Sequence, residues 1–353
     1  MTTTHDQVPE IALQWAQSGR SVALATVIET WGSAPRQPGA LLAISSDGEL
    51  AGSVSGGCVE GAVAAEAMEA MEDGTCKLLK YGVSDDDAFA VGLACGGTIR
   101  VLVEPVGVGE GIPLDELHAL VEARSQRKRM GLAVNLTTKD RALIAVDTPK
   151  KPKPEDAQST TVLMQLMTPL KKAADSDKSG FDETGEWFIA VHNPPLKMAI
   201  IGAAHIAQPL SAMAKMTGFD VTVIDPRESF SSEARFPDVT ISRDWPDEAL
   251  RALAPDARTA IVCLSHDPKI DDPALKVAFD SPAFYIGALG SARTSGKRHD
   301  RLIAEGHTPA DLARIAGPIG LDIGSKSPAE IAVSIMAQIV ERLRKPPTTE
   351  RTA

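Results

Sequence analysis

Residues 198–207, MAIIGAAHIA, decide the fold of the C-terminal half of the chain. Four apolar residues lead into a glycine and then into a helical pattern, which is the order of strand, tight turn and helix that opens a dinucleotide-binding fold. Asp225 ends the next apolar run, where such folds bind a ribose hydroxyl. The sequence therefore predicts a Rossmann-like domain with Gly202, His205 and Asp225 at its ligand-binding edge.

The same alternation of strand and helix continues over residues 196–345 and predicts a doubly wound parallel sheet. We expect strands at 198–201, 221–225, 260–264 and 283–287, and helices at 205–217, 246–253, 272–280 and 328–344. The last helix carries an apolar residue at every fourth position from Ile331 to Leu343. This stripe serves either the core of the domain or a dimer contact.

The dinucleotide fingerprint is incomplete, because Ala204 replaces the glycine that lets the backbone approach a pyrophosphate. The replacement weakens the case for bound NAD, but not the case for the fold. His205 at a helix start and His266 after the third expected strand either face a ligand or are surface residues without one. Asp267 and Asp271 either orient His266 or hold a cation, unless Asp267 simply caps the next helix.

A glycine-serine turn precedes a basic helix further along this half. Residues 287–294, GALGSART, lead from a strand into the helix and expose backbone amides near Ser291. Arg293, Lys297 and Arg301 lie four residues apart and therefore share one helix face. In a chain of net charge −11, this face indicates a phosphate ligand or an acidic partner, or else it is only a solvated basic face.

Residues 52–60, GSVSGGCVE, place a thiol in a glycine-rich loop of the N-terminal half. Two short expected strands precede the loop and a helical pattern follows it, so we expect Cys58 in the first turn of a helix. Free amide groups and the helix dipole there stabilise an anion, either a thiolate or a phosphate. In the alternative interpretation, Gly56 and Gly57 only make a tight turn and Cys58 is a small core residue.

Two further glycine-rich loops, residues 30–39 and 92–97, lie in the same half. Their glycines and prolines forbid regular structure, so both loops can hold polar groups against a ligand. The first contains Arg36 and the second contains another thiol, Cys95. The three loops belong to an expected α/β domain at residues 1–110. Its elements are expected as a helix at 8–19 and strands at 22–28, 40–44, 48–51, 77–81 and 99–104.

Residues 111–195 are expected to connect the two domains. The elements of this part are expected as a helix at 114–128, a hairpin of 131–136 with 142–147, and a returning strand at 187–191. Residues 148–184 are polar and charged, so we expect an exposed excursion with 162–166 as a short strand inside it. Residues 346–353 are expected to form a disordered tail.

The composition is that of a globular protein with two domains, since 43% of the 353 residues are hydrophobic and 24% are charged. The negative net charge argues against a general nucleic-acid or membrane-surface binder. We find no secretory signal pattern and no apolar stretch of about 18 residues, so we expect a cytoplasmic protein. The four cysteines lack zinc-ligand spacing, and Cys76 and Cys263 are expected in the core.

Several long motifs together resemble the XdhC/CoxI family of molybdenum-enzyme maturation factors. In the N-terminal half the resemblance rests on the three glycine-rich loops. In the C-terminal half it rests on residues 201–205 (IGAAH), 225–227 (DPR), 266–267 (HD), 287–291 (GALGS) and 318–324 (PIGLDIG). The resemblance covers nearly the whole chain except about 148–184, and the chain departs from the family pattern at Ala204.

The resemblance implies a cytoplasmic chaperone that binds molybdenum cofactor, as molybdopterin or its dinucleotide form. Such a chaperone protects the cofactor, assists its sulfuration and inserts it into a xanthine-dehydrogenase-type molybdenum hydroxylase, with a cysteine desulfurase as sulfur donor. We therefore expect a maturation factor rather than an enzyme, acting as a homodimer. We expect a nucleotide at the Rossmann-like domain, and neither nucleic acid nor a membrane as a partner.

The resemblance points to the cysteine loops as the cofactor site, without fixing the role of each thiol. A thiolate is a soft ligand for molybdenum, so Cys58 is the expected metal ligand, and glycine loops beside cationic groups suit a pterin phosphate. The candidate residues are Arg36, Ser55, Gly56, Gly57, Cys58, Glu60, Cys95, Gly96, Gly97, Gly202, His205, Asp225, Arg227, His266, Ser291 and Arg293. Two alternatives are an NAD(P)-dependent oxidoreductase with His205 or His266 as acid or base, and a nucleotide-binding scaffold.

Overall fold

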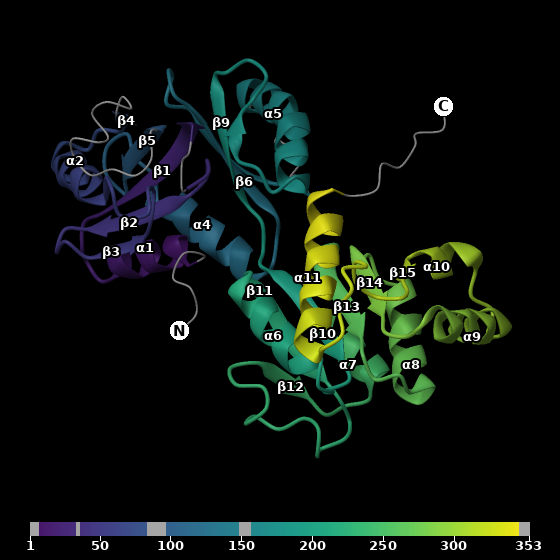
Figure 1. Ribbon diagram of the computed structural model, residues 1–353. Coiled ribbons are helices and arrows are strands. Elements are labelled where there is room, and N and C mark those ends of the chain that lie inside the picture. The colour runs from purple at the N-terminus through teal and green to yellow at the C-terminus, as the bar shows by residue number, and fades with distance from the viewer. Residues whose placement is uncertain (1–6, 33–35, 83–96, 148–156, 346–353) are drawn as a thin grey trace. The chain divides into compact units, whose positions relative to one another are not determined.

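The computed structural model describes residues 7–32, 36–82, 97–147 and 157–345 (Figure 1). The expected disordered tail at 346–353 and the thiol of Cys95 lie outside these residues. Contacts divide the chain into an N-terminal unit, Met1–Pro194, and a C-terminal unit, Pro195–Ala353. The segment that we expected to connect two domains therefore packs as part of the N-terminal unit.

The N-terminal unit contains a five-stranded antiparallel sheet in the order β3-β2-β1-β5-β4. The strands are β1 (Val22–Trp31), β2 (Leu41–Ser45), β3 (Leu50–Gly52), β4 (Lys77–Gly82) and β5 (Thr98–Pro105), and the helices on the sheet are α1 (Val8–Gln17), α2 (Glu60–Asp73) and α4 (Leu114–Ser125). Because side chains alternate along a strand, Ala23 and Val27 pack on α2, whereas Val22 and Leu24 pack on α1 and α4. The apolar run of β1 is thus buried on both faces, as its sequence predicts.

A second antiparallel sheet of this unit has the order β7-β6-β9-β8. Its strands are β6 (Met130–Asn135), β7 (Arg141–Ala145), β8 (Gly180–Phe181) and β9 (Trp187–His192). The expected hairpin and its returning strand are confirmed, because β6 pairs with both β7 and β9. Leu132 and Phe188 on one face pack with Ile28 and Leu102 of the first sheet.

For the described residues 157–184, the exposed excursion expected at 148–184 is wrong, and so is the short strand inside it. Residues Ala157–Asp175 form helix α5, which packs on the second sheet through Leu166 and Leu170. The two leucines lie four residues apart on one face, whereas Lys171 and Lys172 are exposed, so the composition of the segment concealed an amphipathic helix. Gly131 of β6 makes room for Leu170, since a Cβ there would lie 1.8 Å from Leu170 Cδ1.

The C-terminal unit is a six-stranded parallel sheet in the order β12-β11-β10-β13-β14-β15, so the prediction of a doubly wound sheet is confirmed (Figure 1). The strands are β10 (Leu196–Ile201), β11 (Phe219–Ile224), β12 (Thr240–Ser242), β13 (Thr259–Cys263), β14 (Tyr285–Ala288) and β15 (Ile315–Ala316). The helices are α6 (Ala207–Met216), α7 (Pro246–Leu253), α8 (Pro268–Phe279), α9 (Ala292–Ala304), α10 (Pro309–Ala313) and α11 (Pro328–Arg344). The strand order reverses between β10 and β13, which is where folds of this kind bind ligands.

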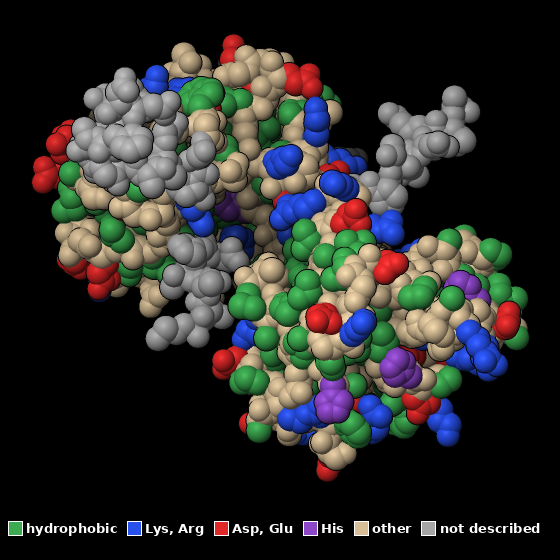
Figure 2. Space-filling view, in the orientation of Figure 1, with side chains coloured by type: hydrophobic (Ala, Val, Ile, Leu, Met, Phe, Trp, Pro, Cys, Tyr) green, Lys and Arg blue, Asp and Glu red, His purple; other side chains and the backbone are tan. Residues whose placement is uncertain are grey.

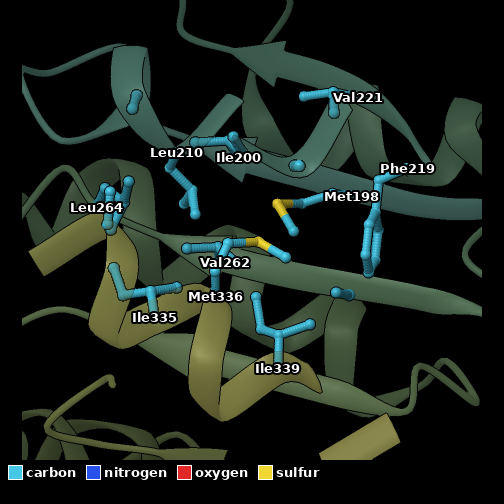
Figure 3. Close-up of a cluster of buried hydrophobic side chains, with 14 of the residues drawn as sticks. Met198, Ile200, Leu210, Phe219, Val221, Val262, Leu264, Ile335, Met336 and Ile339 are labelled. Atoms are coloured by element: carbon cyan, nitrogen blue, oxygen red, sulfur yellow. The ribbon is translucent and has the colours of Figure 1, made fainter. Parts of the chain in front are cut away.

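The apolar stripe of the last helix belongs to the core of the C-terminal unit. Figure 3 shows Ile335 and Ile339 of α11 directed at the central strands, beside Met198 and Val262. Both isoleucines are completely buried. Of the two uses that the sequence allowed for this stripe, the core of the domain is the one observed.

Candidate functional site

The loop that carries Cys58 does not end where its sequence suggested. Helix α2 begins at Glu60 with Val59 as its N-cap, so Cys58 lies before the helix and not in its first turn. Gly56 and Gly57 have φ angles of +81° and +111°, which L-residues rarely adopt, and they turn the chain back on itself. Residues 53–59 therefore form a separate loop between β3 and α2.

The carboxylate of Glu60 fills the centre of this loop. Its oxygens accept hydrogen bonds from the hydroxyls of Ser53 and Ser55 and from the backbone N–H groups of Val54, Ser55, Gly56, Gly57 and Val59. Burial raises the pKa of Glu60, but the hydrogen bonds outweigh it and hold that pKa at about 2. The anion-binding position expected at the helix start exists, and the chain's own carboxylate occupies it.

The Cys58 side chain is exposed at the surface of the same loop. Its backbone N–H donates to Ser55 Oγ at 3.0 Å, so the backbone is held while the thiol is free to meet a partner. Cys76 is partly buried, and burial raises its pKa to about 11. Cys263 is fully buried, and burial raises the pKa of its thiol as well. Among the described cysteines, Cys58 is thus the accessible one, and the interpretation of it as a core residue is wrong.

Arg36 approaches this loop from the neighbouring one. Its Nε donates to the carbonyl oxygen of Ser53 at 3.2 Å, and the side chain is half-buried. Within the described part of the chain, its two terminal nitrogens carry no further hydrogen bond or ion pair, so they are available to an anion. Because Arg36 contacts the Cys58 loop, a ligand bound at this loop can also contact its guanidinium.

Strand direction places the Arg36 loop, the Cys58 loop and the two ends of the third loop at one end of the five-stranded sheet. β1 ends at Trp31 and β2 begins at Leu41, while β3 ends at Gly52, so the Arg36 and Cys58 loops leave from the same end. The third loop lies between Gly82 and Thr98, which pair with each other at that end. Gly97 is half-buried beside Thr98, whereas Cys95 and Gly96 lie outside the described residues.

In the C-terminal unit, Gly202 makes the tight turn after β10. Its φ is +95°, and a Cβ there would lie 2.8 Å from the backbone nitrogen of Ser265, in the loop after β13. The loops after β10 and β13 therefore touch at the point where the strand order reverses. The glycine is required for this close approach.

Asp225 is turned inward and does not face an open crevice. Its carboxylate is completely buried and accepts from the backbone N–H of Ala203 at 2.8 Å and from Arg227 Nε at 2.9 Å. Burial raises the pKa of Asp225, but these hydrogen bonds lower it below its ordinary value. Arg227 in turn lies over the ring of Phe230, 4.3 Å from its centroid. A ribose hydroxyl would have to displace one of these partners.

Other candidates of this unit remain exposed at the carboxyl edge of the sheet. His205, His266, Ser291 and Arg293 are all exposed, and Figure 2 shows histidine side chains with lysine and arginine side chains beside them on this unit. Ser291 caps α9, because its Oγ accepts from the backbone N–H of Thr294. These residues offer cationic and hydrogen-bonding groups at this edge.

The alternative roles of two other residues are now decided by their contacts. Asp267 caps α8, since its carboxylate accepts from the backbone N–H of Lys269 at 2.9 Å. Arg301 pairs with Asp272 through two hydrogen bonds, of 2.8 and 3.1 Å. The basic helix face therefore keeps Lys297 and Arg293 as its exposed charges.

Sequence reasoning missed a buried polar cluster beneath the same edge. Arg298 is 2% exposed and donates to the Leu289 carbonyl oxygen at 2.8 Å, while its Nη2 lies 3.8 Å from Asp271 Oδ2. Asp271 also accepts from Ser265 Oγ at 2.6 Å. The sequence signal was available, because Arg298 falls on the same face of α9 as the buried Ser295 and Leu302.

The described residues contain no cluster of His, Cys, Asp and Glu side chains suited to a resident metal ion. They also include no helix of the length and apolarity needed to cross a membrane. In the N-terminal unit, Glu104, Glu116 and His192 line a small, mainly apolar cavity. The Cys58 loop is separate from this cavity.

Two family models match this chain. Residues 15–82 match the XdhC and CoxI family, and residues 198–339 match the XdhC Rossmann domain. The chain belongs to the XdhC and CoxI family. The first match includes both Arg36 and the whole Cys58 loop, and the second includes the turn at Gly202.

Three known proteins are similar to this family member over almost its whole length. The molybdenum cofactor insertion chaperone PaoD of Escherichia coli is 28% identical, over 96% of this chain and 89% of PaoD. A probable xanthine dehydrogenase subunit of Bacillus subtilis is 27% identical, over 91% of this chain and 93% of that protein. A crystal structure described as a xanthine dehydrogenase from Bacillus halodurans has the same fold, with a TM-score of 0.70 and 24% identity, and covers 99% of this chain and 98% of its own.

Proposed function

We propose that this protein binds molybdenum cofactor and delivers it to an apo molybdenum hydroxylase of the xanthine-dehydrogenase type. The observation that carries the proposal is the exposed thiol of Cys58, held on a glycine-rich loop beside the guanidinium of Arg36. The similarity to a cofactor insertion chaperone along 96% of the chain supports the same role.

The two groups suit two parts of one ligand. A thiolate is a soft ligand that binds molybdenum well, and a guanidinium pairs with the phosphate of the pterin through charge-assisted hydrogen bonds. We assign Cys58 to the metal and Arg36 to the phosphate. We also assign Cys95, Gly96 and Gly97 to the proposed site, and Cys95 and Gly96 lie outside the described residues.

The C-terminal unit is proposed to bind a nucleotide. His205, His266 and Arg293 are exposed at the carboxyl edge of the parallel sheet, where such folds bind nucleotides, and Arg227 is also partly exposed. Gly202 and Asp225 then shape the turn from inside, and Ser291 caps the helix that carries Arg293. We further propose a homodimer, with a cysteine desulfurase as the partner that supplies sulfur for the cofactor.

A reconstitution experiment tests delivery. The protein is loaded with cofactor, freed of excess ligand and mixed with an apo molybdenum hydroxylase, whose recovered activity is then measured. We expect the loaded protein to restore more activity than the same amount of free cofactor, since a chaperone protects it on the way. Equal recovery with free cofactor would remove delivery from the proposal.

A further inference from the structure

Most donors of the loop around Glu60 converge on the Glu60 carboxylate, and the Cys58 N–H donates instead to Ser55 Oγ. Oε1 accepts hydrogen bonds from the Ser53 hydroxyl and from the N–H groups of Val54, Ser55 and Gly56. Oε2 accepts hydrogen bonds from the Ser55 hydroxyl and from the N–H groups of Gly57 and Val59. A carboxylate offers about four lone-pair positions, so seven donors use its accepting capacity fully. The same bonds occupy these amides, which leaves them with nothing to donate to a second anion.

Other hydrogen bonds hold the start of the loop, where Arg36 Nε donates to the Ser53 carbonyl oxygen and the Ser53 N–H donates to that of Leu41. Gly56, Gly57 and Cys58 are exposed, and a Cβ placed on Gly57 would meet no atom within 4 Å. Among the described residues, Val54 and Ser55 are buried and Val59 is half-buried against the core. The Cys58 N–H donates to Ser55 Oγ, and the Ser55 hydroxyl in turn donates to Glu60. The position of the Cys58 backbone therefore depends on Glu60 through Ser55.

We infer that Glu60 is a positioning residue, which holds Cys58 in place and closes the loop amides to the phosphate of the cofactor. This inference rests on the proposed function, in which Cys58 contacts molybdenum. In this inference the loop contacts the cofactor only through the sulfur of Cys58, and Arg36 binds the phosphate. A tethered carboxylate with seven donors outcompetes a free phosphate, because its local concentration far exceeds that of any ligand in solution.

The geometry is tested first without cofactor. Hydrogen exchange of the peptide spanning 53–60 is measured in the wild type, in Glu60→Gln and in Glu60→Asp, with Glu72→Gln as the control, since Glu72 is exposed on the same helix. We expect the amides that donate to Glu60 to exchange at least about tenfold faster in both Glu60 variants and unchanged in the control. Asp keeps the charge, but its side chain is one methylene shorter and should not reach the loop donors. A wild-type exchange rate in Glu60→Asp would therefore contradict the role of these hydrogen bonds in holding the loop.

Cofactor retention separates the positioning role from the proposed function. Loss of a group that orients a metal ligand weakens binding by about 10- to 100-fold, so Glu60→Gln is expected to retain that much less cofactor although Cys58 is present. Wild-type retention in Glu60→Gln overturns the positioning role and leaves the proposed function standing. If the wild type itself retains no cofactor, the proposed function fails and the positioning role fails with it.

Inorganic phosphate distinguishes a closed loop from one whose carboxylate the ligand displaces. In the wild type, millimolar phosphate is expected to leave exchange in the 53–60 peptide unchanged, whereas in Glu60→Ala added acetate is expected to restore protection. Phosphate that alters exchange of the wild-type loop would show that it reaches the amides, and this result contradicts a closed loop.

Discussion

The carboxylate of Asp225 accepts the backbone N–H of Ala203 at 2.8 Å, across the turn that opens the Rossmann-like sheet. Arg227 pairs with the same carboxylate from the other side, and Asp225 is completely buried between them. A dinucleotide-binding fold normally offers this acidic group to a ribose. Here the chain uses it to fix its own turn, which speaks against an NAD-dependent oxidoreductase of the ordinary kind.

Substitution of Asp225 is therefore expected to cost stability rather than only affinity. Asp225→Asn replaces an acceptor with a donor facing Arg227, so we expect the free energy of unfolding of the C-terminal unit to fall by about 2–4 kcal/mol. Urea denaturation followed by circular dichroism measures the change. Asp220→Asn, at an exposed position of β11, is the control and should change it by less than about 0.5 kcal/mol. Equal stability of the two variants would contradict a structural role for Asp225.

The turn at Gly202 gives a second stability prediction. In Gly202→Ala the new Cβ would lie 2.8 Å from the Ser265 backbone nitrogen, so the two loops must separate and we expect a loss of at least about 3 kcal/mol. Gly218→Ala is the matched control, because Gly218 also has positive φ, at +86°, but no atom lies within 4 Å of its Cβ position. It should lose only about 1–2 kcal/mol. Similar losses in both variants would show that φ alone, and not the loop contact, requires glycine.

Removal of the buried Arg298 would leave the charge of Asp271 uncompensated, which lowers the free energy of unfolding. In Arg298→Met, Asp271 loses its cationic neighbour in a site that is 1% exposed, and we expect a loss of about 3–5 kcal/mol in the free energy of unfolding. Adding Asp271→Asn to this variant removes the buried charge and should recover part of the loss. Lys297→Met, on an exposed position of the same helix, serves as the control. A double variant no more stable than Arg298→Met would mean that charge is not the cause.

His192 makes the stability of the N-terminal unit depend on pH. Burial, with a smaller effect of the positive charge of Arg124, lowers the pKa of His192 from 6.5 to about 3. Below pH 6.5 the unfolded chain therefore binds a proton that the folded chain excludes, and stability falls by about 1.4 kcal/mol per pH unit until about pH 3.

Urea denaturation between pH 7.5 and 5 avoids the contribution of Glu60, because the unfolded chain protonates that carboxylate only near pH 4.5. We expect the slope to be shallower in His192→Leu and unchanged in His118→Leu, where the histidine is exposed in the same unit. A slope that is the same in both variants and in the wild type would assign the pH dependence to other groups.

The sequence predicted most of the fold because its strands are unbroken apolar runs between glycine or proline turns. The parallel order around residues 198–201 follows from alternation alone. Helix α5 was not predicted from the sequence, because charged flanks dominate the composition of its segment and its buried face is only a few residues wide. The average polarity of a segment is easy to read from its sequence, whereas a narrow apolar face of a helix is not.

The candidate site was harder to predict, because side chains decided it. Glycine spacing indicated an anion-binding loop correctly, but not that Glu60 would occupy it. The position of Asp225 at the end of a strand was also predicted, since it directly follows β11, although its direction depends on Ala203, a residue 22 positions earlier. Contacts of this kind form only when separate segments fold together, and no local pattern records them.

Cofactor retention by a single variant pair tests the central claim most directly. Wild type, Cys58→Ser and Cys76→Ser are each mixed with molybdenum cofactor and desalted, and bound molybdenum is measured per chain. Because Cys58 is the exposed thiol and Cys76 is partly buried with a pKa raised to about 11, we expect the wild type and Cys76→Ser to retain cofactor alike. Cys58→Ser should retain at least about tenfold less. Undiminished retention in Cys58→Ser would contradict the assignment of Cys58 to molybdenum.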